Sequence, residues 1–337
     1  MEHKLIDLKA QYQSLKPQID EAVSKVMESG NYILGKNVNA FEQEFAEYNG
    51  FKYGVGVASG TDALIIALRA NSIINKSIIT TPLSFFATTE AILQTGNIPQ
   101  FVDVSYGCNI ELSSTIDIPV EFLGNSLNTV NEKDFTIVDC AQSAGLKQKS
   151  GKTQCYSFFP GKNLGCMGDG GMILTDSLYI ADKCRILRKH GAILKSYHEC
   201  VGYNSRLDEI QAAILRVKLP YLDTWVKRRQ EIAKIYNSRL SELGYKIIKT
   251  NKSVYNYYVF YHPEREKLAE YLKSKGIETG CYYKYPLHLL PATEHLGYRV
   301  GDFPTAEYHC ENNIALPMYP ELTDDMVKYY IDVIRIF

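Results

Sequence analysis

The chain has 337 residues, of which 37 are basic and 38 acidic, so its formal net charge is −1. This balance gives no global electrostatic reason to expect nucleic acid or an anionic membrane as a partner. Hydrophobic residues make up 45% and charged residues 22%, the composition of an ordered soluble protein, and the length fits about two domains.

The N-terminal segment mixes charged and apolar residues and lacks the apolar core of a signal peptide. No apolar run approaches the roughly 20 residues that span a bilayer. The eight cysteines are scattered without a CxxC pair, which argues against a disulfide framework and a zinc site. We therefore expect a cytoplasmic protein with no membrane segment and no metal site.

Residues 51–70 predict a small apolar strand, a tight turn at Ser59-Gly60-Thr61 and a helix with apolar residues at helical spacing. Two short apolar runs follow, SIITTP and IPQFVDV, separated by a helix, FFATTEAILQTG, that Gly96 can cap. Because strands and helices alternate, we expect an α/β fold built on a mostly parallel sheet.

The next segments carry the polar residues that suggest chemistry. The run DFTIVDCAQSAG places Asp139 at the end of a buried strand. The run TQCYSFFPGKNLGCMGDGGMILTD predicts two strands joined by a glycine-rich loop that holds Lys162.

The remainder of the chain predicts a second, smaller unit. Residues 204–244 read as a long helix that Pro220 breaks or kinks, and such a helix commonly bridges two domains. Beyond it we expect a strand in YNYYVFYH, a helix in EREKLAEYLKSKG, a strand in IETGCYY and a final helix capped by Thr323. We therefore divide the chain into a large domain, residues 1–235 with an N-terminal helical segment, and a small α+β domain, residues 236–337.

Three features have both a functional and a structural interpretation. The Ser59-Gly60-Thr61 turn suits an anion, since free backbone N–H groups and the helix dipole converge there, but it also suits an ordinary helix cap. A buried Asp139 needs a cation, which a protonated pyridine nitrogen or an arginine would supply. Lys162 suits a Schiff base if its solvation is low, although a lysine in a loop usually extends into solvent.

The sequence resembles the DegT/DnrJ/EryC1/StrS family of nucleotide-sugar aminotransferases, which depend on pyridoxal phosphate (PLP) and have the aspartate-aminotransferase fold (fold type I). The likeness extends over nearly the whole chain. Its motifs include GNYILGKNVNAFEQEFAEYNG, VASGTDAL, VDCAQSAG, SFFPGKNLGCMGDGG, GYNSRLDEIQAAIL and LGYRVGDFPTAE. The resemblance implies a large domain with a seven-stranded type of sheet and a small C-terminal domain.

The resemblance also implies a role for individual residues. Lys162 would carry PLP as a Schiff base and move protons between cofactor and substrate. Asp139 would pair with the pyridine nitrogen. The other implied cofactor contacts are Gln142 beside the ring and its 3-hydroxyl, Phe85 on the ring face, Gly60, Thr61 and Ser157 at the phosphate, and Asn204 at the phosphate of the neighbouring subunit. The active site would then belong to a homodimer.

Substrate contacts are harder to assign. Tyr32 and Tyr283 are candidates because tyrosines stack on or hydrogen-bond to sugars and bases, but most tyrosines pack at interfaces. His288 is equally compatible with a core position and with a substrate pocket.

The activity that the resemblance implies is transfer of an amino group from L-glutamate, through PLP, to the keto carbon of a nucleotide sugar, for surface-polysaccharide or other glycan biosynthesis. The motifs favour a dTDP-3-keto-6-deoxyhexose over a UDP-linked 3-keto uronate or a 4-keto-6-deoxy sugar. Two other classes are a non-catalytic nucleotide-sugar-binding protein of this fold and a nicotinamide-dependent dehydrogenase. The spacing of Gly54, Gly56 and Gly60 misses GxGxxG, which disfavours the dehydrogenase.

The chain departs from the family in two places. The segment between Val104 and Val138 is shorter than in the family, so one helix that covers the sheet is expected to be missing or reduced. Val138 stands where the family often has an acid.

Overall fold

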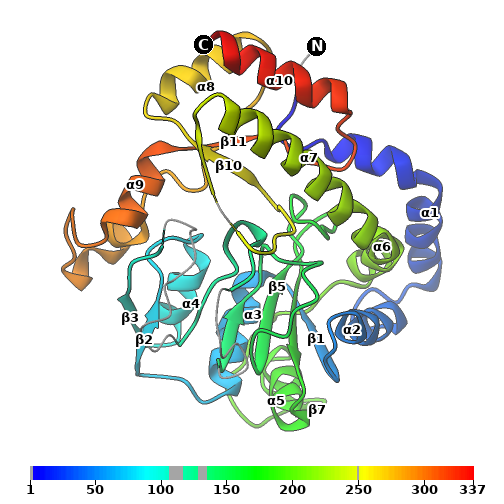
Figure 1. Ribbon diagram of the computed structural model, residues 1–337. Coiled ribbons are helices and arrows are strands. Elements are labelled where there is room, and N and C mark those ends of the chain that lie inside the picture. Colours follow the sequence, from blue (N-terminus) through cyan, green and yellow to red (C-terminus); the bar gives the residue numbers. More distant parts are fainter. Residues whose placement is uncertain (1–2, 106–116, 128–134, 249) are drawn as a thin grey trace.

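The structure is a computed structural model that describes residues 3–105, 117–127, 135–248 and 250–337. In this part of the chain, helices surround a sheet in the lower half of Figure 1, and a smaller group of helices and strands lies above it. Most of the shortened segment between Val104 and Val138 falls outside the described residues, and with it the predicted loss of a helix.

Two helices precede the sheet: α1 (Leu8–Ser29) and α2 (Lys36–Tyr48). The Asp7 carboxylate accepts a hydrogen bond from the Ala10 N–H at 3.0 Å and so caps α1. The α2 N-terminus is capped from a distant part of the chain, because the Glu209 carboxylate accepts the N–H groups of Asn37 and Val38 at 2.6 and 3.0 Å.

The main sheet has the strand order β1-β6-β5-β4, and a parallel pair, β2-β3, lies beside it. The strands are β1 (Tyr53–Val57), β2 (Ser77–Thr80), β3 (Ile98–Phe101), β4 (Ile137–Asp139), β5 (Thr153–Ser157) and β6 (Gly171–Thr175). Strand β6 runs antiparallel to β1 and β5, whereas β4 and β5 are parallel. The two strands predicted around the glycine-rich loop are therefore confirmed.

Residues 117–121 join these two groups of strands. The Ile118 N–H donates to the Ile79 carbonyl on β2 at 3.2 Å, and the Glu121 N–H donates to the Asp139 carbonyl on β4 at 3.0 Å. Val120 and Asp139 form a parallel bridge. The hydrogen-bonded layer thus continues from β1 to β3, as the α/β prediction requires.

Both faces of the main sheet are buried, because alternate residues of a strand point to opposite sides. Val55, Ile137 and Ile173 face a core that contains α3 (Gly60–Ala70) and α5 (Leu178–Leu187). Val138 and Tyr156 face the opposite core, to which α2 and α6 (Glu209–Lys218) contribute. The main sheet is therefore covered by helices on both faces.

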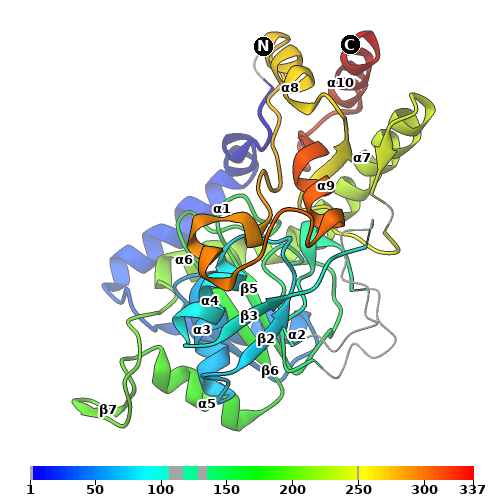
Figure 2. The ribbon, with the colours of Figure 1, turned by 90° about the vertical axis from the view of Figure 1, so that its left-hand side faces the viewer.

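Helix α4 (Ala87–Gln94) connects β2 and β3 as predicted. Gly96, at a φ of +74°, donates its N–H to the Leu93 carbonyl at 3.0 Å and ends the helix. A hairpin, β7 (Ala192–Leu194) and β8 (Tyr197–His198), projects from the body of the protein (Figure 2).

The long helix of residues 204–244 is shorter than predicted. Residues 204–208 are extended: Asn204 bridges Lys189, and Asp208 bridges Ile33. These backbone pairings replace the first turn of a helix, which begins only at Glu209. The break at Pro220 is confirmed, since a 3₁₀ turn (Leu219–Tyr221) separates α6 from α7 (Leu222–Glu242).

A further hydrophobic core, formed by residues between 232 and 334, lies beyond this break. Its elements are β9 (Lys246–Ile247), β10 (Tyr258–Tyr261), α8 (Arg265–Ser274), β11 (Asn313–Leu316) and α10 (Asp324–Ile336). Thr323 caps α10, as predicted, by accepting from the Met326 N–H. The division of the chain at residue 235 stays a prediction.

The strand predicted in IETGCYY is wrong. Ile277 and Gly280 each form a single bridge, with His3 and Ala315 respectively, so no continuous ladder develops. Strand β11 occupies the position beside β10 instead, with Val259 opposite Ala315.

Candidate active site

Lys162 lies in the loop that joins β5 to β6. Backbone hydrogen bonds close this loop: the Phe158 N–H donates to the Gly170 carbonyl at 2.8 Å, and the Cys166 N–H donates to the Phe158 carbonyl at 2.8 Å. The Lys162 N–H donates to the Phe159 carbonyl at 2.9 Å. The loop therefore presents Lys162 from a fixed backbone.

The Lys162 amine is desolvated. Burial lowers the pKa of Lys162 to about 8, and the nearby charge of Asp139 acts in the opposite direction. A lysine with a lowered pKa is neutral more often near physiological pH, so its lone pair is available for reaction with a carbonyl.

Asp139 ends β4 and is almost entirely buried. Its Oδ2 accepts a hydrogen bond from the Thr88 hydroxyl at 2.7 Å, and its Oδ1 accepts one from the Ala141 N–H at 3.0 Å. Burial raises the pKa of Asp139, whereas these two donors and the charge of Lys162 lower it. The structure thus places a buried carboxylate near a desolvated amine.

Gln142 and Tyr283 meet beside this pair. The Gln142 Oε1 accepts from the Leu123 N–H at 2.6 Å, and its Nε2 donates to the Tyr283 hydroxyl at 3.0 Å. The Tyr283 ring lies 5.8 Å from the ring of Phe85, measured between centroids. Phe85 is 56% exposed, so its ring has a free face.

The Ser59-Gly60-Thr61 turn begins α3. The Ser59 side chain accepts the Asp62 N–H at 3.1 Å, which leaves the N–H groups of Gly60 and Thr61 without a partner among the residues that the structure describes. A Cβ on Gly60 would lie 2.7 Å from the Ser157 Cβ, so the two residues are in close contact. Two free N–H groups and the Ser157 hydroxyl therefore converge at a helix N-terminus, the arrangement that binds phosphate.

Three predicted residues lie outside this group. Asn204 is exposed. The Tyr32 hydroxyl donates to the Met27 carbonyl at 3.3 Å, and the ring is half exposed. His288 is buried, with its Nε2 at 3.0 Å from Glu307. Within one chain, the Tyr32 and His288 side chains therefore contact other parts of the protein.

Thr88 is a polar contact of this site that the sequence alone did not indicate. It lies on α4, 51 positions before Asp139, and its hydroxyl also meets the Ser84 hydroxyl at 2.9 Å. No motif of the sequence marks Thr88, because its contact with Asp139 depends on how α4 packs beside the end of β4.

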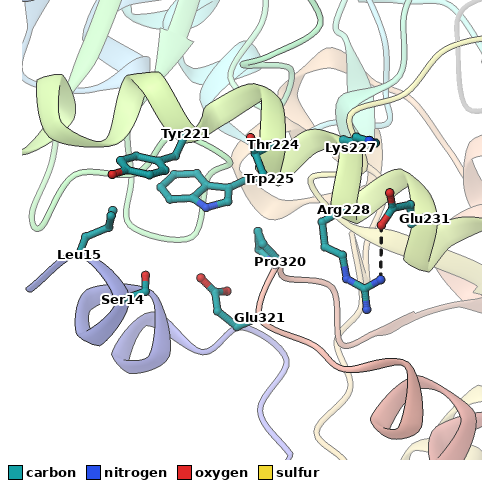
Figure 3. Close-up of a pocket in the computed structure, with 10 residues that line it drawn as sticks. All are labelled: Ser14, Leu15, Tyr221, Thr224, Trp225, Lys227, Arg228, Glu231, Pro320 and Glu321. Atoms are coloured by element: carbon teal, nitrogen blue, oxygen red, sulfur yellow. Dashed lines mark hydrogen bonds and ion pairs between the residues drawn. The ribbon is translucent and has the colours of Figure 1, made fainter.

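A different surface feature, an open groove of about 550 Å³, lies between α1, α7 and residues 320–321 (Figure 3). Its wall contains the stacked rings of Tyr221 and Trp225, 6.0 Å apart, and the carboxylate of Glu321. Neither Lys162, Asp139 nor any other residue of the candidate active site lines this groove.

The residues at the Lys162 site fit PLP in three respects. Asp139 is a buried acceptor with no ion pair among the described residues, and a pyridinium would supply the missing cation. Lys162 is an amine with a lowered pKa. The turn at Gly60 offers free N–H donors for a phosphate.

A desolvated lysine opposite a buried aspartate, on an α/β sheet of this kind, defines a PLP-dependent enzyme of fold type I. The chain belongs to the DegT/DnrJ/EryC1/StrS aminotransferase family, which it matches over residues 13–115 and 130–335. The protein is therefore an aminotransferase, and its cofactor is PLP.

Similar proteins cover almost the whole chain. A "pleiotropic regulatory protein" of Geobacillus stearothermophilus is 39% identical, over 99% of this chain and 98% of that protein. A dTDP-3-amino-3,4,6-trideoxy-alpha-D-glucose transaminase of Streptomyces venezuelae is 33% identical, over 98% and 94%. A UDP-N-acetyl-3-dehydro-alpha-D-glucosamine 3-aminotransferase of Acidithiobacillus ferrooxidans is 34% identical, over 98% and 96%.

The crystal structure of S. venezuelae DesV with a ketimine intermediate superposes on this chain with a TM-score of 0.92. The two sequences are 32% identical, and the match covers 99% of this chain and 98% of that one. The fold prediction is thus confirmed.

None of the helices within the described ranges has the length and apolar character that a membrane crossing needs.

Proposed function

We propose that this aminotransferase transfers the amino group of L-glutamate to C3 of a dTDP-linked 3-keto-6-deoxyhexose. The observation that supports amination at C3 is that both transaminases compared above, from S. venezuelae and A. ferrooxidans, are named for a nitrogen at position 3. The dTDP nucleotide is supported by relatives that are named for dTDP-linked sugars, among them the S. venezuelae transaminase.

PLP, when bound, accepts the amino group and withdraws electrons from the carbon to which it is attached. The residues of the chain supply its binding and the movement of protons. Asp139 provides a buried negative charge for the pyridine nitrogen, and Gly60, Thr61 and Ser157 provide donors for the phosphate. Gln142 and Phe85 are suited to the ring's 3-hydroxyl and its face.

Lys162 Nζ is the group that takes a proton from the substrate carbon and returns it. Because its pKa is about 8, about a tenth of the free lysine is neutral at pH 7, against fewer than about one in a thousand for an ordinary lysine. Asp139 limits this shift, since its negative charge favours the protonated amine.

Tyr283 is the candidate substrate contact that the structure supports best. Its hydroxyl accepts from Gln142, so its own proton is free to donate to a sugar oxygen. Tyr32 and His288 stay predictions, because their described contacts do not include the Lys162 group.

We further propose that the active enzyme is a homodimer, in which Asn204 serves the phosphate site of the partner. The exposure of Asn204 supports this assignment. An equal mixture of Lys162→Ala and Asn204→Ala chains tests it. About half of the dimers are then hybrids with one intact site of two, so the mixture should recover about a quarter of the wild-type activity, more than either variant alone. No recovery after confirmed subunit exchange would contradict a shared site.

Absorbance tests the lysine assignment directly. After incubation with PLP and removal of the unbound cofactor, the purified protein should keep a Schiff-base absorbance band in the violet that Lys162→Ala lacks. Identical spectra for the two proteins would rule out a covalent link at Lys162.

The sugar assignment needs a separate assay. We would incubate the enzyme and glutamate with dTDP-3-keto, dTDP-4-keto and UDP-linked 3-keto sugars and read the products by mass. Turnover of the dTDP-3-keto sugar should exceed that of the others. Faster turnover of a UDP-linked or 4-keto sugar would replace our assignment with that alternative.

The name of the Geobacillus relative supports a second candidate function, a regulatory one. A regulatory protein of this family would bind the nucleotide sugar without turning it over. The same mass assay separates the two, because tight binding without any amino product would favour the regulatory role. We also propose a cytoplasmic location, which the scattered cysteines of the sequence, with no CxxC pair, support.

A further inference from the structure

The Asp139 carboxylate is held by a chain of two hydroxyls that no part of the proposed reaction uses. Ser84 Oγ lies 2.9 Å from Thr88 Oγ1, and Thr88 Oγ1 lies 2.7 Å from Asp139 Oδ2. All three side chains are at most 4% exposed. The two hydroxyls and the Asp139 carboxylate therefore lie in a region from which water is largely excluded.

The direction of these hydrogen bonds follows from the charge of Asp139. An ionised carboxylate only accepts hydrogen bonds, so the single proton of the Thr88 hydroxyl must point to Asp139. Thr88 then has only lone pairs to offer Ser84, and the Ser84 hydroxyl must donate to it. If Asp139 were protonated, it could donate to Thr88, and both bonds could reverse.

We propose that Thr88 is the positioning residue that holds Asp139 as an oriented, ionised carboxylate, with Ser84 orienting the Thr88 hydroxyl. This inference rests on the proposed role of Asp139 as the partner of the pyridine nitrogen. Thr88 acts through Asp139, because the carboxylate that it fixes is the group that meets the cofactor.

Helix α4 contains a natural control for this proposal. Thr89, the next residue, is also fully buried, but its hydroxyl has no hydrogen-bond partner among the described residues. Thr88→Val and Thr89→Val therefore make the same chemical change at neighbouring buried positions. Only Thr88→Val removes a donor from Asp139.

The charge of Asp139 can be measured through its effect on the pKa of a neighbouring group. The titratable groups that face it are the Lys162 amine, the Tyr283 hydroxyl and the thiols of Cys140 and Cys155. Among them, only Lys162 is a base, so loss of the Asp139 charge should make its amine easier to deprotonate.

The experiment measures acylation of Lys162 against pH by mass spectrometry, on the full-length chain before PLP is added. The midpoint is the pH at which the acylation rate is half of its maximum. We expect Thr88→Val to lower this midpoint by about 0.5 pH unit or more, and Asp139→Asn to lower it further. Thr88→Ser should restore the wild-type midpoint, and Thr89→Val should leave it unchanged. An unchanged midpoint in Thr88→Val, or an equal shift in Thr89→Val, would overturn the proposal.

A second readout is the affinity for PLP, followed by absorbance. Thr88→Val should weaken binding about tenfold, whereas Thr88→Ser and Thr89→Val should stay within about twofold of the wild type. If Thr88→Val does not fold, Ser84→Ala should still shift the Lys162 midpoint in the same direction, and no shift there would count against the proposal. If the wild-type chain binds no PLP, the proposed function fails, whereas the acylation midpoints still decide the role of Thr88.

Discussion

The side-chain amide of Gln142 donates a 3.0 Å hydrogen bond to the hydroxyl of Tyr283, which lies 141 positions further along the chain. Gln142 follows β4 of the main sheet, and Tyr283 belongs to the segment that precedes β11. This bond therefore connects the proposed cofactor site to the C-terminal part of the protein.

Tyr283→Phe should lower kcat/KM about tenfold with little effect on folding. The change removes the acceptor of Gln142 and the donor offered to the substrate, at a cost of about 1 kcal/mol per hydrogen bond. Steady-state kinetics and thermal unfolding would check this. Tyr285→Phe, at an exposed tyrosine two positions away, is the control and should behave as the wild type.

The rate at which Lys162 takes up PLP should rise about tenfold per pH unit below pH 8 and level off above it. The reason is that only the neutral amine attacks a carbonyl, and burial has lowered the pKa of this lysine to about 8. Stopped-flow absorbance across a range of pH would measure the midpoint. A rate that keeps rising to about pH 10 would show an ordinary, solvated lysine.

Gly171→Ala should displace the Ser59-Gly60-Thr61 turn, our proposed phosphate site. A Cβ at this position would lie 2.2 Å from the Ser59 carbonyl oxygen and 2.9 Å from the Gly60 nitrogen, so the backbone must move. We expect PLP affinity to fall at least about tenfold and the free energy of unfolding to fall by about 1 to 3 kcal/mol. In Gly168→Ala the nearest atom, at 3.0 Å, belongs to the Gln211 side-chain amide and not to the backbone, so both quantities should change less.

Arg188→Met should lower the free energy of unfolding by about 3 kcal/mol, because it leaves the buried Glu42 carboxylate without its cation. The Arg188 guanidinium also donates to the Gly56 carbonyl on β1 at 2.7 Å. This carbonyl would lose its donor in the variant. Denaturant titration would measure the change. Arg239→Met, at an exposed ion pair with Glu242, should leave unfolding unchanged within error.

The sequence predicted most elements of the main sheet, because both their hydrophobic pattern and their turn residues are local properties. It also placed Asp139 at the end of a strand and Lys162 in the loop between two strands, and the structure brings these two residues together. What it could not predict depends on contacts distant in sequence. Residues 277–283 and 313–316 are both short runs that mix polar and apolar residues, and only packing decides that the second pairs with β10.

The same limit applies to individual site residues. Thr88 carries no pattern of its own, and its role is visible only because α4 packs beside the end of β4. His288 is a candidate by residue type, and its role in substrate binding stays a prediction; in the structure Glu307 and the ring of Phe303 enclose it.

Helix α7 packs against two hydrophobic cores at once. Leu222 and Val226, near its start, belong to the core of the main sheet, whereas Ile232 and Tyr236 belong to the C-terminal core. Between them the helix is continuous, and buried Arg229 donates to the carbonyls of residues 255 and 318. A helix shared in this way links the melting of one core to that of the other, so a calorimetric scan should show one cooperative transition in place of two.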